Sequence, residues 1–212
     1  EAAKRYYAEI MMPFRRMIER NLDKLSDYDI QLIAPSHGPA YDRPAFILDA
    51  YADWVAPQAK NEVVLPYVSM HGSTDLMVER LVDRLAVQGV TVYPFDLTVT
   101  DIGQLAIHLV DAASLVVATP TFHVGPHPAV YYAAHLANLL RPKLKYAAMI
   151  GSYGWGSKAF EQLTELIPNL KVEVLGTVLN KGLPTDATYK ELDELAGKIA
   201  DAHRKDETIV GT

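Results

Sequence analysis

From about residue 62 onward, short apolar runs alternate regularly with longer segments that carry an apolar stripe at helical spacing. Short runs that are apolar on both faces are typical of strands in a buried parallel sheet. Such runs occupy residues 63–68, 90–95, 115–118, 146–150 and 172–178. Apolar residues at three- and four-residue steps predict amphipathic helices, and they occur at residues 75–88, 101–111, 128–140, 158–167 and 186–204.

This alternation of strand and helix predicts an α/β fold with a five-stranded parallel sheet and helices on both faces. The right-handed crossover rule leaves few strand orders, and five strands favour the flavodoxin-like order. In such sheets ligands bind beyond the carboxyl ends of the strands, near the point where strand order reverses. The loops after the first, third and fourth strands are therefore the places to search for a site.

The beginning of the chain follows a different pattern. Residues 1–25 predict one amphipathic helix, whose apolar stripe consists of Tyr7, Ile10, Met11, Phe14, Ile18, Leu22 and Leu25. Residues 30–34 predict a short strand that runs into a Pro/Gly loop, and residues 44–55 predict a second helix. Because Pro57 and polar neighbours interrupt the pattern, we predict two domains, at residues 1–58 and 59–212.

Composition narrows the class of protein. The 212 residues contain no apolar run long enough to cross a bilayer, so no membrane association is expected. The formal charge of −6 is spread along the chain, which argues against polyanion binding as the main activity and against nucleic acid as a partner. The absence of cysteine excludes disulfides and thiolate metal sites and agrees with a cytoplasmic protein. The start at Glu1, without a signal segment, is interpreted as cut or processed.

The loop after the first strand combines three hydroxyl groups, a glycine and the start of a helix. Unpaired N–H groups at a helix start, together with hydroxyls, form a cradle for a phosphate group. The loop contains no lysine and matches neither a P-loop nor a G-x-G-x-x-G turn, so a terminal phosphate monoester fits better than a pyrophosphate. An ordinary helix cap is the alternative. The candidate residues are Ser69, Met70, His71, Gly72, Ser73 and Thr74.

The loops after the third and fourth strands carry aromatic residues between prolines and glycines. Such loops can bracket a planar heteroaromatic ring, because glycine permits close approach and aromatic side chains can stack. The alternative is turn chemistry with aromatics that belong to the core. The candidates are Pro120, Thr121, Phe122, His123, Val124 and Gly125 in one loop and Ser152, Tyr153, Gly154, Trp155 and Gly156 in the other.

The sequences Ser-Met-x-Gly-Ser-Thr, Thr-Pro-Thr-Phe-x-x-Gly-Pro-x-Pro and Gly-Ser-Tyr-Gly-Trp-Gly resemble the three FMN loops of flavodiiron proteins (A-type flavoproteins). The resemblance implies that residues 69–74 hold the ribityl phosphate of FMN and that residues 120–125 and 152–156 surround the isoalloxazine ring. His123 and Val124 stand where the family often has asparagines. Upstream, Ala3–Phe14 and Leu32–Pro39 resemble the end of the family's metallo-β-lactamase-like domain, so this chain resembles the C-terminal part of the protein.

The same resemblance implies that His37 is the last ligand of a diiron centre whose other ligands are absent from this sequence. It implies an oxidoreductase, an oxygen or nitric oxide reductase, in which this flavoprotein domain performs electron transport from a donor such as rubredoxin or reduced F420. This fragment alone is expected to lack reductase activity. The complete protein is expected to form a head-to-tail homodimer or homotetramer.

Two other functions stay open, a stand-alone flavodoxin-like electron carrier and a flavodoxin-like quinone reductase. A CheY-like receiver is excluded, because residues 69–74 lack the acidic cluster that holds magnesium. His123 and His127 are separated by Pro126, which prevents the helix needed for a metal-binding pair. His108 and His135 are interpreted as solvated or capping residues, and His203 indicates no function.

Overall fold

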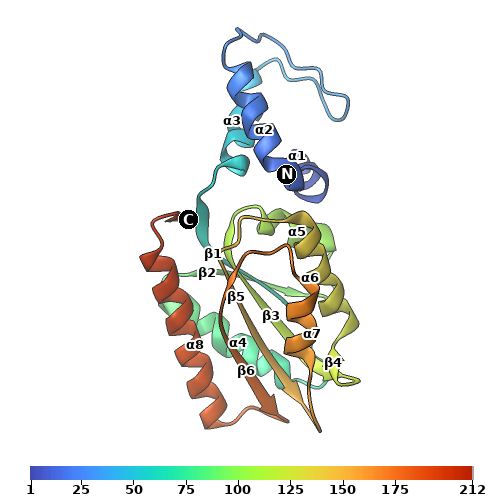
Figure 1. The fold of residues 1–212 in the computed structure, drawn as a ribbon, viewed down its shortest axis with the longest axis vertical. Coiled ribbons are helices and arrows are strands. Elements are labelled where there is room, and N and C mark those ends of the chain that lie inside the picture. Colours follow the sequence, from blue (N-terminus) through green and yellow to red (C-terminus); the bar gives the residue numbers. More distant parts are fainter. Residues whose placement is uncertain (212) are drawn as a thin grey trace.

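The computed structural model describes residues 1–211, and its centre is a seven-stranded sheet (Figure 1). Five parallel strands follow the order β2-β1-β3-β5-β6. Two short strands were missed by the sequence pattern: β4 (Gly125–Pro126) pairs with β3, and β7 (Ile209–Val210) pairs with β1. The five parallel strands are β1 (Ala59–Tyr67), β2 (Thr91–Asp96), β3 (Ala112–Phe122), β5 (Tyr146–Tyr153) and β6 (Glu173–Lys181).

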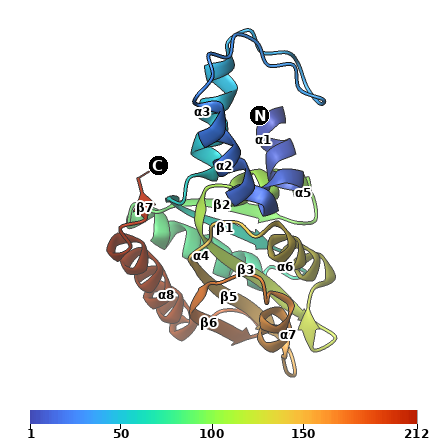
Figure 2. The same ribbon diagram turned by 45° about the horizontal axis from the view of Figure 1, so that its top comes forward.

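Helices cover both faces of this sheet, as the alternation predicted (Figure 2). One face carries α4 (Ser73–Val87) and α8 (Asp186–Lys205). The other carries α5 (Ile102–Leu109), α6 (Pro128–Leu140) and α7 (Ala159–Leu166). The strand order and the two helical layers confirm the flavodoxin-like fold class.

The central strands are apolar on both faces because each face contacts a different helical layer. In β1, Val63 and Leu65 pack with α4 and α8, whereas Val64 packs with the opposite layer. In β5, Ile150 packs with α4 and α8, whereas Met149 packs with the opposite layer. Successive side chains of a strand point to opposite faces, so a continuous apolar run is required here.

Residues 1–58, which we call the N-terminal segment, lie against the amino end of the sheet, over α5 and α6 (Figure 1). Residues 1–25 do not form the single helix predicted for them. They consist of α1 (Ala2–Tyr6), a π-helical turn (Tyr7–Met11), a 3₁₀ turn (Met12–Phe14) and α2 (Arg15–Leu25). Pro13 has no N–H and its ring clashes with the carbonyl four residues earlier, which accounts for the break.

The break also rotates the apolar stripe. Ile10 and Phe14 are half exposed, whereas Ala8 and Met12 are buried beside Tyr7. The predicted stripe was therefore wrong at these positions, because a π turn and a 3₁₀ turn no longer follow the spacing of 3.6 residues per turn. The Tyr7 hydroxyl donates to the carbonyl of Trp54 in α3 (Pro44–Val55), which matches the second predicted helix.

The strand predicted for residues 30–34 is absent. Only Ile33 forms an isolated antiparallel bridge, with Tyr41 on the returning side of a loop. Leu32 is 60% exposed and Ile33 is half buried, so this segment has no sheet to join within the described residues. Its apolar pattern alone could not stabilise a strand, because a strand needs a paired neighbour for its backbone groups.

Candidate functional site

Three loops meet around one cavity at the carboxyl ends of β1, β3 and β5. We call residues 69–74 loop 1, residues 120–125 loop 2 and residues 152–156 loop 3. The cavity measures about 630 Å³. It is lined by Met70, His71, Ser73, Thr74, Pro120, Thr121, Phe122, His123, Val124, Ser152, Tyr153, Gly154, Trp155, Gly156 and Gly182.

Loop 1 turns into α4 through Gly72, whose φ of 83° is a left-handed conformation that suits glycine. The Ser69 hydroxyl accepts hydrogen bonds from the N–H groups of Gly72 (3.2 Å) and Asp75 (3.3 Å). Ser69 thus serves the helix start rather than the cavity, and neither Ser69 nor Gly72 belongs to the lining. In the described part of the chain no acceptor is found for the N–H groups of Ser73 and Thr74.

The floor of the cavity joins loop 1 to loop 3. Thr74 is 1% exposed, and its hydroxyl lies 3.3 Å from the hydroxyl of Ser152. No lysine or arginine lines the cavity. An anion at this end would therefore be held by hydroxyls and backbone N–H groups, with the positive end of the α4 dipole behind them.

Loop 2 makes a strained turn between β3 and β4. His123 and Val124 have φ values of 46° and 72°, although neither is glycine. Positive φ is unusual for a β-branched residue and concentrates at functional sites. The carbonyl of Val124 accepts a 2.7 Å hydrogen bond from the N–H of Lys158, which ties this turn to the segment after loop 3. The turn leaves Phe122, His123 and Val124 exposed at the cavity.

Loop 3 presents Tyr153 and Trp155, and Trp155 is fully exposed. A large aromatic ring without neighbours is uncommon and indicates a surface that binds something. The Thr121 hydroxyl donates to the Ser157 hydroxyl at 2.9 Å, so loop 2 is tied a second time to the segment that follows loop 3. The aromatic residues thus belong to the cavity wall rather than to the core.

Two glycines lie elsewhere than the sequence suggested. Gly125 is buried in β4, where a Cβ atom would lie 2.3 Å from the Gln162 side-chain oxygen, and it does not line the cavity. Gly182, which sequence reasoning missed, does line it. Its φ is 74° and its N–H donates to the carbonyl of Tyr153 at 3.0 Å. The sequence could have indicated Gly182, because Gly182 and Pro184 follow the fifth predicted strand, whose carboxyl end lies at the same edge of the sheet.

His37 lies far along the chain from these loops, in the exposed loop of the N-terminal segment. Its ring lies 5.6 Å from that of Tyr6. Within residues 1–211 no three His, Asp or Glu side chains come close enough together to hold a metal ion. The residues present therefore do not fit a binuclear metal centre. No helix of this part of the chain is long and apolar enough to cross a membrane.

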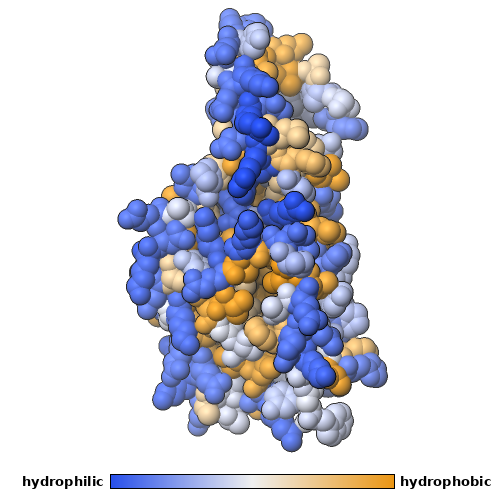
Figure 3. Space-filling model, in the orientation of Figure 1, coloured by the Kyte–Doolittle hydropathy of each residue, from blue (hydrophilic) through white to orange (hydrophobic). Residues whose placement is uncertain are grey.

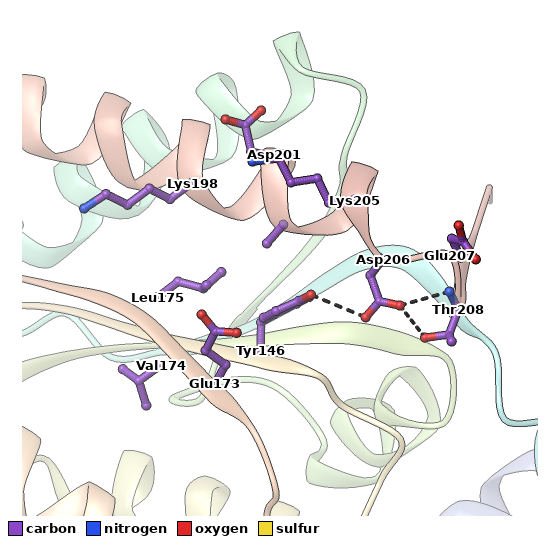
Figure 4. Close-up of a pocket in the computed structure, with 11 residues that line it drawn as sticks. Tyr146, Glu173, Val174, Leu175, Lys198, Asp201, Lys205, Asp206, Glu207 and Thr208 are labelled. Carbon is purple, nitrogen blue, oxygen red and sulfur yellow. Dashed lines mark hydrogen bonds between the residues drawn. The ribbon is translucent and has the colours of Figure 1, made fainter.

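A second hollow, of about 830 Å³, lies at the amino ends of β5 and β6 beside the end of α8 (Figure 4). There the Tyr146 hydroxyl donates to Asp206, which also accepts from Thr208. Side chains of both signs line it, among them Glu173, Lys198 and Lys205. These charges can satisfy one another, so the cavity between the three loops is the stronger candidate site.

Comparison with known proteins identifies relatives of this chain. No protein-family model matches the chain. Over 210 residues, which is 95% of this chain and 52% of the relative, it is 35% identical to a protein named nitric oxide reductase from Moorella thermoacetica. It is 26% identical over 210 residues to a protein named coenzyme F420H2 oxidase from Methanothermobacter marburgensis.

The solved structure of rubredoxin oxygen:oxidoreductase from Desulfovibrio gigas superimposes with a TM-score of 0.87 at 27% identity, covering 94% of this chain and 51% of that one. This chain is a region of a flavodiiron protein. The resemblance of this chain to the flavodiiron family is thereby confirmed. The flavodiiron protein from Giardia intestinalis shares the fold, with a TM-score of 0.81 at 24% identity over 94% of this chain and 51% of that one. The chain spans about half the length of these flavodiiron relatives.

Proposed function

We propose that this region binds FMN in the cavity between loops 1, 2 and 3 and passes electrons through it. One observation carries the proposal: unpaired backbone donors and an exposed aromatic ring line the same cavity. A cavity of about 630 Å³ is within the range of cofactor sites. When bound, FMN supplies the redox chemistry, and the residues of this chain bind and orient it.

The donors at the α4 end fit the phosphate of FMN. The N–H groups of Ser73 and Thr74 lack acceptors among residues 1–211, and the Thr74 hydroxyl faces Ser152 alone. Buried donors without partners cost free energy, which a phosphate at this position would recover. A monoester suits the site, because no basic side chain is present to neutralise a longer phosphate chain.

The aromatic end fits the isoalloxazine ring. Tyr153 and Trp155 of loop 3 and Phe122 of loop 2 line the same cavity. Stacking on the cofactor would remove the exposed Trp155 ring from water. The hydrogen bonds that tie loop 2 to the segment after loop 3 hold the two walls in register, so the ring would enter a largely formed site.

The family of this region suggests its place in a larger protein. We propose that residues 59–212 form the FMN domain and that residues 1–58 belong to a separate metal-binding domain, with His37 as one ligand. The other ligands would come from sequence outside this chain, so we derive no step through iron. The names of two relatives suggest rubredoxin or reduced F420 as donor. Cytoplasmic location and a head-to-tail homodimer or homotetramer complete the proposal.

A stand-alone electron carrier and a quinone reductase gain less support. The match to the nitric oxide reductase of Moorella covers 95% of the chain and therefore includes most of the N-terminal segment. A carrier needs no such segment. We propose an oxidoreductase role, oxygen or nitric oxide reduction, for the longer protein, with electron transfer as the part this region performs.

The first prediction is that the purified chain retains FMN and not FAD. Flavin released by heat is identified by mass spectrometry, and apo-protein is titrated with both cofactors. FAD in the protein, or no response to added FMN, would refute the proposal.

The same preparation, given ferrous iron and a reductant, is expected to consume oxygen slowly and to form hydrogen peroxide. Rapid consumption without peroxide would show that this chain alone is a reductase.

A further inference from the structure

A groove of about 730 Å³ lies where the N-terminal segment meets residues 59–211, which we call the sheet domain. It lies at the end of the sheet opposite the proposed FMN cavity. Its walls are the start of α2, the loop from α6 to β5, and the loop after α7. On the face shown in Figure 3, dark-blue hydrophilic residues run from α2 down to this junction. The proposed flavin chemistry uses no residue of this groove.

The groove collects positive charge in an acidic chain. Its lining contains seven basic residues and no Asp or Glu, whereas the whole chain has 20 basic and 26 acidic residues. Lys143 lies 3.8 Å from Asp111 behind the wall. The other six form no ion pair within residues 1–211, and they are Arg15, Arg16, Arg20, Arg141, Lys145 and Lys171.

Holding these cations together without anions raises the free energy of the folded chain. Burial lowers the pKa of Lys143, and the positive charges of Arg15 and Lys60 lower it further against the pull of Asp111. Arg141 occupies a left-handed backbone conformation, with φ of 51°, at the end of α6. Glycine or asparagine is usual there, so the arginine is maintained at a cost in strain. A bound anion would offset the repulsion.

The floor of the groove is apolar. Met12 and Leu144 are buried there, whereas Phe14 and Met17 are about half exposed. Arginine guanidinium groups bind phosphate oxygens in pairs, and an exposed phenyl ring can stack on a base. We propose that this groove binds a small molecule of the nucleoside di- or triphosphate class, with its phosphates on the arginines and its base on the apolar floor. A long nucleic acid is not favoured, because the acidic remainder of the chain would repel it.

The test uses ATP and inorganic tripolyphosphate as probes, by calorimetry on the 212-residue chain at about 0.15 M ionic strength. ATP is expected to bind more tightly than tripolyphosphate. The double variant Arg16→Glu, Arg20→Glu is expected to weaken both about tenfold or more, since each lost guanidinium removes charge-assisted hydrogen bonds. Phe14→Ala is expected to weaken ATP but not tripolyphosphate.

Lys24→Glu is the matched control, because Lys24 lies on the same helix, is exposed and does not line the groove. It should change either affinity by less than about twofold, as expected of a screened surface charge. FMN content and circular dichroism report whether each variant folds. The proposal is overturned by an ATP dissociation constant above about 1 mM, by ATP binding no tighter than tripolyphosphate, or by an equal effect of Lys24→Glu.

Discussion

Thr74 is the buried residue that links the helix start of loop 1 to loop 3. Its hydroxyl lies 3.3 Å from the Ser152 hydroxyl and beside the unpaired N–H groups at the start of α4. In the proposed complex it donates to the FMN phosphate. Riboflavin has the same ring but no phosphate, so it separates this contact from contacts with the ring.

Thr74→Val is therefore expected to weaken FMN binding by about 1–3 kcal/mol, the cost of losing a buried hydrogen bond to a charged group. Riboflavin affinity should stay the same. Fluorescence titration of apo-protein measures both. Thr177→Val, at an exposed site in β6, is the control and should affect neither ligand. Equal losses for FMN and riboflavin would place Thr74 away from the phosphate.

His203 has a structural role that its charged helix did not reveal. It is 3% exposed, and its ring nitrogens pair with the Ser114 hydroxyl at 2.6 Å and the Asn61 side-chain oxygen at 2.8 Å. Its ring stacks on Tyr146 at 5.9 Å between centroids. Burial lowers the pKa of His203 from 6.5 to about 4, although the charge of Asp206 acts in the opposite direction.

Because the folded pKa lies below the unfolded value, this histidine adds stability that is complete above pH 6.5 and is lost as the pH falls towards 4. The loss should approach about 3 kcal/mol. In urea unfolding across this range, His203→Gln should show a shallower pH dependence than the unchanged chain. His135→Gln, at an exposed position, is the control. Parallel curves for His203→Gln and the unchanged chain would contradict the assignment.

Loop 2 shows how an element can be held in a conformation that its residues disfavour. The left-handed His123–Val124 turn depends on the hydrogen bond from Lys158 and on the link between Thr121 and Ser157. Left-handed backbone costs a residue with a Cβ atom about 1–2 kcal/mol. Asparagine tolerates this conformation better than valine.

Val124→Asn is accordingly expected to raise the free energy of unfolding of the flavin-free chain by about 1 kcal/mol. Urea denaturation measures the change. Val174→Asn is the matched control, because Val174 is similarly exposed but lies in β6 at negative φ. The control should lose stability, since asparagine is disfavoured in strands. A loss at Val124 as large as at Val174 would mean that the turn is not strained.

At the scale of the whole molecule, the buried carboxylate of Asp111 helps to join the N-terminal segment to the sheet domain. Asp111 is 3% exposed, follows α5 and lies 2.6 Å from the ammonium of Lys4 in α1 and 3.2 Å from that of Lys60 in β1. Lys143 approaches its other oxygen at 3.8 Å. Although burial opposes it, hydrogen bonding and charge from Lys4 and Lys60 keep the pKa of Asp111 below its usual value.

Asp111→Asn should lower the free energy of unfolding by about 3 kcal/mol, because it leaves the surrounding ammonium groups without their anion. Asp53→Asn removes a carboxylate 3.9 Å from Lys60 that is 60% exposed, and it should cost less than about 0.5 kcal/mol. Chemical unfolding of both variants gives the comparison. Similar small losses would show that other contacts, such as those around Tyr7 and Trp54 and the Arg5–Asp101 pair, hold the segment in place.

The sequence by itself determined the sheet domain and the place of its site. Strands buried on both faces must be apolar throughout, and helices that pack on a core need apolar residues at helical spacing. Both patterns are local, so they can be recognised in the sequence. Loops 1, 2 and 3 could be predicted because parallel strands bring their carboxyl ends to one edge. Fourteen of the fifteen residues lining the cavity came from these loops, and Gly182 was the exception.

Only the tertiary structure decided where exceptions to those patterns occur. Pro13 broke the helix predicted for the N-terminal residues. Residues 30–34 form no strand, because no partner strand lies beside them among residues 1–211. The positive φ of Val124, the burial of His203 and the charge around Asp111 each depend on residues distant in sequence. Contacts of this kind arise from folding, when helix ends and loops far apart in the chain are packed together, and no local pattern encodes them.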